Sequence, residues 1–233
     1  MPQENKNPDL SRRNFLKAMG VLAVGVGVAG ILRGVVIDII PPNQNVESGY
    51  PTLQLALPNG NPVHTSDLIV NNPQIVIFNY PLQNEPNFLL RLGDSNNNDV
   101  AVQPTEVTIP ATGAKFTSPG GAGPYKSVVA SSAICQHLGC VPPEIRFHPP
   151  NDTSYPGKIH CDCHGSTYDP YQGFSVVTGP TQSPLPNVKL VYDATNDTYS
   201  ASLMIGPVIY GRTSDLSGGN PISGNSTEVT TIS

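Results

Sequence analysis

The chain has 233 residues and a formal net charge of −5, and Lys, Arg, Asp and Glu make up only 12% of it, against roughly 25% in ordinary globular domains. The negative charge argues against nucleic acid as a partner, because such binding needs a basic surface. A surface with few carboxylates loses little stability when those groups are protonated, which favours an acidic exterior.

Residues 1–17 form the first recognisable segment and end in S-R-R-N-F-L-K. This run resembles the twin-arginine export signal. That export route carries folded proteins, which suits a protein whose cofactor is inserted in the cytoplasm. The alternative is a chance pair of arginines.

Residues 18–39 are predicted to form a single transmembrane anchor. Residues 18–32 carry no charge, Arg33 interrupts, and apolar residues continue to Ile37. As a helix this stretch of about 20 residues would be about 30 Å long, enough to span a bilayer. The positive residues Arg12, Arg13 and Lys17 precede it, so we expect the N-terminus inside and the rest of the chain outside. A cleaved signal peptide is the alternative, although no A-x-A cleavage site is present.

The remaining chain is predicted to be an all-β domain. Residues 40–51 are rich in Pro, Asn and Gly and are expected to be a hinge linker, and the domain itself is placed at residues 52–210. Short apolar runs between turn clusters predict an antiparallel sandwich, and no stretch after residue 40 shows capped helical periodicity. The expected strands are residues 53–57, 68–70, 75–78, 88–92, 107–109, 127–130, 158–160, 174–177, 188–192 and 199–204. Residues 211–233 are polar and are expected to be a mobile tail.

Two short boxes contain every cysteine of the chain. The first is C-Q-H-L-G-C at residues 135–140, and the second is C-D-C-H-G-S at residues 161–166. Each box is too short to surround a metal alone, so two loop tips would have to converge on one site. The residue types leave three readings open, namely a metal site, a disulfide, or both. A zinc site of the Cys₂His₂ type would leave two cysteines without a role, and two plain disulfides are the other alternative.

The two boxes resemble the motifs C-x-H-x-G-C and C-x-C-H-x-S of the Rieske iron–sulfur proteins. Within that family the chain resembles the quinol-oxidising cytochrome bc type of bacteria or archaea. The resemblance implies a Rieske-type antiparallel β-sandwich with a cluster-binding subdomain at about residues 127–186. It also implies a set of roles within the boxes. Cys135 and Cys161 would ligate one iron of a 2Fe-2S cluster, His137 and His164 would ligate the other, and Cys140 and Cys163 would form a disulfide.

Further residues of the site follow from the same resemblance. Ser166 and Tyr168 occupy positions that donate to a bridging sulfide and to a cysteine sulfur in high-potential members, although they are otherwise readable as a turn serine and a core tyrosine. Leu138 and Pro180 are the candidates for an apolar cover over the cluster. Gly139 permits the positive φ that a tight turn often needs.

The connection between the boxes, residues 141–160, is longer than is common in the family, and we expect an enlarged loop there. It contains His148 and His160. A lone histidine is more often a surface or structural residue than a ligand, so we assign neither to an additional metal or proton site.

The ligand set predicts the function. Replacing two thiolates by two imidazoles makes the oxidised cluster formally neutral, which raises its potential to roughly −150 to +300 mV. By resemblance, His164 and His137 are the residues at which an electron and a proton from quinol are taken up together. The electron would go to a cytochrome-type acceptor, while a cytochrome b-type membrane subunit takes the second electron. The alternatives are the small Rieske subunit of an exported molybdenum oxidase and a secreted zinc or disulfide domain without a redox role.

These features together predict the location. The domain is expected on the extracytoplasmic side of the cell membrane, held by a single pass, because disulfides persist outside the cytosol.

Overall fold

The computed structural model describes residues 49–232, and this part of the chain consists of β-strands and loops. The helical elements within it are two short 3₁₀ turns, η1 (Thr65–Asp67) and η2 (Pro170–Gln172). The predicted all-β class is therefore confirmed. None of the helical segments in residues 49–232 has the length and hydropathy that a membrane crossing needs. The predicted export signal, the anchor and most of the linker lie outside the described residues.

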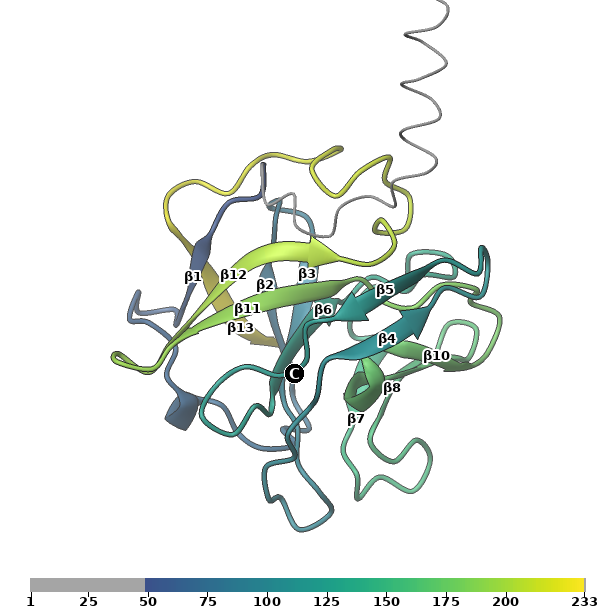
Figure 1. Ribbon diagram of the computed structural model, residues 1–233, viewed down its shortest axis with the longest axis horizontal. Helices are drawn as coiled ribbons and strands as arrows, with labels where there is room; N and C mark the ends of the chain where they lie inside the picture. The colour runs from purple at the N-terminus through teal and green to yellow at the C-terminus, as the bar shows by residue number, and fades with distance from the viewer. Residues whose placement is uncertain (1–48, 233) are drawn as a thin grey trace, which may run out of the picture. The chain divides into compact units, whose positions relative to one another are not determined.

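Seven strands form a closed barrel (Figure 1). In their order around it they are β1 (Leu53–Ala56), β12 (Thr198–Ile205), β11 (Asn187–Asp193), β6 (Val128–Ser132), β3 (Pro86–Arg91), β2 (Ile75–Asn79) and β13 (Ser226–Ile232). Neighbouring strands are antiparallel except β1 and β13, whose parallel pairing closes the ring. Alternate side chains point inward, since Leu53 and Leu55 of β1 are buried whereas Gln54 between them is only partly so.

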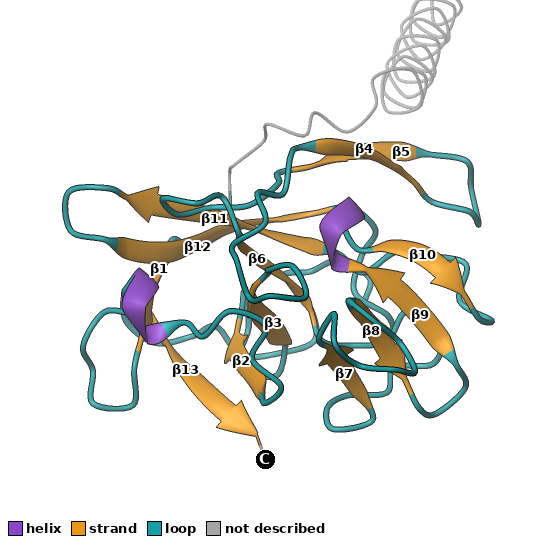
Figure 2. Ribbon diagram, turned by 90° about the horizontal axis from the view of Figure 1, so that it is seen from below, coloured by secondary structure: helices purple, strands orange, loops and turns teal. Residues whose placement is uncertain are grey.

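A second sheet of four strands lies within residues 127–186, the range predicted for the cluster-binding subdomain. Its strands in spatial order are β10 (Ser175–Thr178), β9 (Ser166–Asp169), β8 (Lys158–Cys161) and β7 (Ile145–His148). Figure 2 shows this sheet beside the barrel strands β2 and β3. One apolar core joins the two sheets, because Phe88 and Leu90 of β3 cluster with Ile145, Ile159 and Tyr168 of the smaller sheet. The smaller sheet therefore packs against the outside of the barrel.

A separate hairpin lies between the barrel strands β3 and β6 in sequence. It consists of β4 (Thr105–Thr108) and β5 (Lys115–Ser118), which pair antiparallel. Ser118 at its end is buried and donates to the Asn187 side chain of β11 at 2.7 Å. This contact ties the hairpin to the barrel.

Two predictions about single segments were wrong. The expected mobile tail, residues 211–233, contains β13, which alternates buried Thr227 and Val229 with exposed Ser226 and Glu228. Threonine and valine favour a half-buried strand, so low apolar content did not mean disorder. This strand also closes the larger sheet, because it pairs with both β1 and β2. Residues 68–70, expected as a strand, form only an isolated bridge at Val70. Strand β7 lies within the long connection at residues 141–160, and the loop that follows it extends to β8.

Candidate metal centre

The first box is a tight turn after β6. The backbone N–H of Cys135 donates to the carbonyl of Cys140 at 2.8 Å, and the N–H of Gly139 donates to the carbonyl of Cys135 at 2.9 Å. Gly139 has φ +78°, which confirms the expected positive φ. The turn therefore folds back on itself with His137 at its centre.

The second box is the hairpin between β8 and β9. Cys161 is the last residue of β8 and Ser166 the first of β9. The N–H of Gly165 donates to the carbonyl of Cys161 at 2.9 Å, and Gly165 has φ +85°. The N–H of Asp162 donates to the carbonyl of Glu144 at 2.7 Å, which ties this hairpin to the connection that precedes β7.

A disulfide joins the two boxes. Cys140 and Cys163 are bonded, with their Cα atoms 6.8 Å apart, so the predicted pairing is confirmed. Cys135 and Cys161 are free, and the Cys161 sulfur lies within 4.8 Å of both disulfide sulfurs. Because disulfide sulfurs are not thiolates, Cys135 and Cys161 are the cysteines left to bind a metal.

The predicted ligands separate into a buried pair and an outer pair. The thiols of Cys135 and Cys161 are 1% and 0% exposed. The rings of His137 and His164 meet edge to face with their centroids 4.8 Å apart, and His164 is exposed. The structure thus brings together the two histidine rings, one from each box, and buries the two free cysteines.

Several buried polar atoms at this place have no partner within residues 49–232. They include Nδ1 of His137 and Oγ of Ser166. A buried polar atom without a hydrogen bond is costly, so each needs a partner that the protein itself does not supply. Burial, with a contribution from the Cys135 hydrogen bond, also raises the pKa of Cys161 to about 11. Such a thiol is deprotonated by a bound metal ion rather than by water. The residues present therefore fit an iron–sulfur cluster, with a free histidine nitrogen, two thiols and a free hydroxyl.

Tyr168 contacts the first box from its buried side. Its hydroxyl lies 3.3 Å from Sγ of Cys135 and accepts from the backbone N–H of Gln136 at 3.1 Å. The side chain is fully buried, and this burial raises the pKa of Tyr168, with a further contribution from Cys135. The phenol therefore keeps its proton and has an O–H to donate to sulfur.

Comparisons with known proteins agree with this geometry. Residues 96–189 match the family model of the Rieske [2Fe-2S] domain. This part of the chain is a Rieske domain. Its cofactor is a Rieske-type [2Fe-2S] cluster, and its role is electron transfer.

Relatives resemble the chain well beyond that segment. The cytochrome b6-f complex iron-sulfur subunit of Synechococcus sp. (strain JA-3-3Ab) is 26% identical over 83% of this chain and 88% of its own length. A second such subunit, from Synechocystis sp. (strain ATCC 27184 / PCC 6803 / Kazusa), is 28% identical over 74% of each chain. Among solved structures, the soluble domain of Rieske protein II (soxF) from Sulfolobus acidocaldarius is 28% identical, with a TM-score of 0.51 over 77% of this chain and 89% of that one.

The two residues predicted to cover the cluster are exposed, and a third residue packs on the second box. Leu138 is 54% exposed and Pro180 is also exposed. The close contact is made by the neighbouring Gly179, where an added Cβ would lie 2.4 Å from the carbonyl oxygen of Gly165 and 2.6 Å from Cα of Ser166. The proline-rich segment thus packs on the second box through its backbone. The boxes did not identify Gly179, because close packing and a positive φ make a glycine necessary there, and neither can be read from the motifs.

The histidines of the long connection are buried and contact neighbouring side chains. His148 and His160 are 7% and 6% exposed. His148 Nδ1 lies 3.0 Å from a carboxylate oxygen of Asp152, His160 Nδ1 lies 2.9 Å from the Thr167 hydroxyl, and the His160 ring stacks on Tyr155. These contacts hold β7 to β8 and β9 behind the second box.

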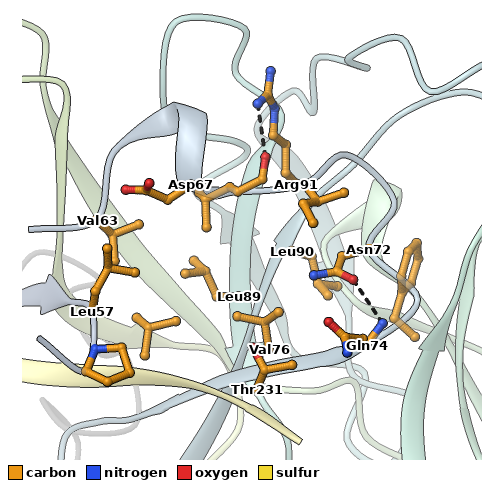
Figure 3. Close-up of a pocket in the computed structure, with 15 residues that line it drawn as sticks. Leu57, Val63, Asp67, Asn72, Gln74, Val76, Leu89, Leu90, Arg91 and Thr231 are labelled. Carbon is orange, nitrogen blue, oxygen red and sulfur yellow. Dashed lines mark hydrogen bonds between the residues drawn. The ribbon is translucent and has the colours of Figure 1, made fainter. Parts of the chain in front are cut away.

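A cavity of about 360 Å³ opens elsewhere, at the barrel (Figure 3). Its walls include Leu57, Val63, Leu89 and Arg91. None of the predicted cluster ligands lines it, so the cavity is separate from the Rieske site.

Proposed function

We propose that this protein is the high-potential electron-transfer subunit of a quinol-oxidising complex in the cell membrane. Its relatives include proteins described as iron-sulfur subunits of the cytochrome b6-f complex, and they are similar over most of both chains. By analogy, its partners would be quinol, a cytochrome b-type membrane subunit and a cytochrome-type electron acceptor. The role of an oxidoreductase subunit follows from this assembly.

Four residues would hold the cluster. Cys135 and Cys161 would bind one iron as thiolates, and His137 and His164 would bind the other, His137 through its unpartnered Nδ1. When bound, the cluster supplies one-electron redox chemistry at a potential that two imidazole ligands raise to roughly −150 to +300 mV. Ser166 and Tyr168 would donate hydrogen bonds to sulfur, which stabilise the reduced form.

The single observation that carries this proposal is the placement of the two imidazoles. Both thiols are buried, whereas His164 is exposed and touches His137 edge to face. The ring nitrogen of His164 that would not bind metal is therefore accessible to quinol, and in its deprotonated form it would accept a hydrogen bond, and then a proton, from a quinol hydroxyl. Such a group couples proton uptake to electron uptake, because the imidazole becomes more basic as the metal it binds gains an electron.

The membrane location is part of the same proposal. Residues 18–39 would anchor the chain, with residues 40–51 as a linker to the Rieske domain. The Cys140–Cys163 disulfide favours an oxidising, extracytoplasmic compartment for that domain.

Two measurements test the proposal. The dithionite-reduced protein should show the EPR signal of a mixed-ligand [2Fe-2S] cluster, and its potential should fall as pH rises. His164→Gln should abolish the signal, whereas His64→Gln, a histidine whose Nδ1 lies 3.0 Å from the Asp197 carbonyl in the barrel, should retain it. A potential independent of pH up to pH 10, or bound zinc and no signal, would contradict the function.

A further inference from the structure

The segment that follows β12 contacts the first box of the Rieske site. We call residues 206–219 the C-terminal strap. The strap lies outside the matched segment at residues 96–189, and Figure 1 shows it leaving the end of β12 toward the top of the view. Its Tyr210 contacts the first box, since an added Cβ on Gly139 would lie 3.0 Å from Cδ1 and 3.3 Å from Cε1 of the tyrosine ring.

The strap is fixed to the barrel on both sides of Tyr210. Ile209 is 1% exposed and belongs to the barrel core. The buried Asp215 accepts the backbone N–H of Ile209 at 2.9 Å and the hydroxyl of Tyr50 at 3.2 Å. Arg212 Nε lies 3.3 Å from the carboxylate of Glu85. A ring held at this place has little freedom to move away from Gly139.

The first box has few other covers on its outer side. Leu138 and Val141 are 54% and 44% exposed. The turn at residues 135–140 depends on two backbone hydrogen bonds, from Gly139 to Cys135 and from Cys135 to Cys140, and His137 lies inside that turn. Displacement of Gly139 would lengthen the first of these bonds and move His137 with it.

We propose that Tyr210 is a positioning residue for the first box, and that it holds His137 in place by bracing the Gly139 turn and excluding water from it. This inference rests on the proposed ligand role of His137. The bracing needs the aromatic ring and not its hydroxyl, because the contact is made by ring carbons. The ring is 40% exposed, so its removal leaves the barrel core intact.

The test compares Tyr210→Ala with Tyr210→Phe and Leu216→Ala in the full, cluster-loaded protein. Leu216 is a strap residue of similar exposure, 41%, whose side chain lies against Gly49 instead of a box. Hydrogen exchange followed by mass spectrometry reports the two boxes separately. Tyr210→Ala should speed exchange in residues 135–141 at least about fivefold and leave residues 161–166 unchanged, whereas the other two variants should match the parent protein.

The reduction potential of the cluster is the second readout. In Tyr210→Ala it should rise, because water then reaches a centre whose reduced form carries one more negative charge. In Tyr210→Phe it should stay at the parent value. Unchanged exchange in residues 135–141, an equal increase at both boxes, or an unaltered potential would overturn the inference. Failure of the proposed function would appear independently, in the EPR signal and pH titration of the parent protein.

Discussion

The two boxes have the same internal structure but different covers. In each, a glycine with positive φ donates its N–H to the carbonyl of the first cysteine at 2.9 Å, Gly139 to Cys135 and Gly165 to Cys161. The second box is covered by the backbone of Gly179, which lies inside the matched Rieske segment. The first box is covered by a side chain, Tyr210, from outside that segment.

The two covers differ in the kind of change that should disrupt them. Backbone packed on backbone leaves no room for a side chain, so the second cover depends on one glycine. The first cover depends on a strap that is fixed by two buried carboxylates, Glu85 and Asp215. We therefore expect the second box to be sensitive to added volume, and the attachment of the first cover to be sensitive to pH.

The largest effect is expected for Gly179→Ala. The new methyl group would overlap the Gly165 carbonyl at 2.4 Å, and Gly179 has φ +97°. Overpacking and a positive φ together should cost about 4 kcal/mol of unfolding free energy. Urea unfolding and iron content, measured on the purified protein, give the result.

Gly165→Ala is the matched control for that change. Gly165 also has a positive φ, +85°, but an added Cβ meets nothing within 4 Å. Its cost should be the conformational strain alone, about 1 kcal/mol. Equal losses for both alanines would mean that the Gly179 segment does not pack on the second box.

Loss of the disulfide should affect both boxes together. The bond between Cys140 and Cys163 closes a loop with a sequence separation of 23. Its removal in the double serine variant should cost about 3 kcal/mol, since the unfolded chain gains freedom. Chemical denaturation gives this value, and hydrogen exchange should increase in residues 135–141 and in residues 161–166. An increase confined to one box would show that the bridge does not couple them.

The sequence was sufficient for much of this site and insufficient for its covers. The resemblance of the two boxes to the Rieske motifs implied the Cys140–Cys163 pairing. The tight turn of the first box indicated the positive φ of Gly139, which is a local property of a short loop. Gly179 and Tyr210 could not be found in this way, since their roles arise from packing against residues distant in sequence. Strand β13 was missed for a related reason, because its seven residues, STEVTTI, are too polar to predict a strand without the neighbours that pair with it.

The attachment of the strap should depend on pH through Glu85. This side chain is 0% exposed, and burial raises its pKa from 4.5 to about 7, although Arg212 opposes the shift. A raised pKa in the folded state means that the folded protein binds the proton more tightly. The corresponding stability is fully present below pH 4.5 and is lost as pH rises through about 7.

Glu85→Gln should therefore flatten the pH dependence. Between pH 8 and pH 5 the parent protein should gain about 2 kcal/mol from this group, and the variant should lack that gain. Urea unfolding of both proteins across this range isolates the contribution, because other titrating groups are common to both. Parallel curves for the two proteins would assign the pH dependence to other groups.

The smallest effect is expected for Tyr168→Phe, which acts on the first box from its inner side. The change removes the acceptor of the Gln136 N–H and the O–H beside the Cys135 sulfur. Stability should fall by about 1 kcal/mol, and the potential should fall by roughly 50 mV, since a donor to sulfur stabilises the reduced state. Protein-film voltammetry and urea unfolding measure the two quantities.

Tyr171→Phe separates the sulfur contact from the general loss of a tyrosine hydroxyl. Tyr171 donates to the Gly93 carbonyl at 2.7 Å and contacts neither box through its hydroxyl. It should lose a similar stability and keep the parent potential. If both variants lower the potential equally, the Tyr168 hydroxyl does not act on the Cys135 sulfur. If neither does, support of the first box comes from Tyr210 on its outer side and the disulfide, and Tyr168 serves packing alone.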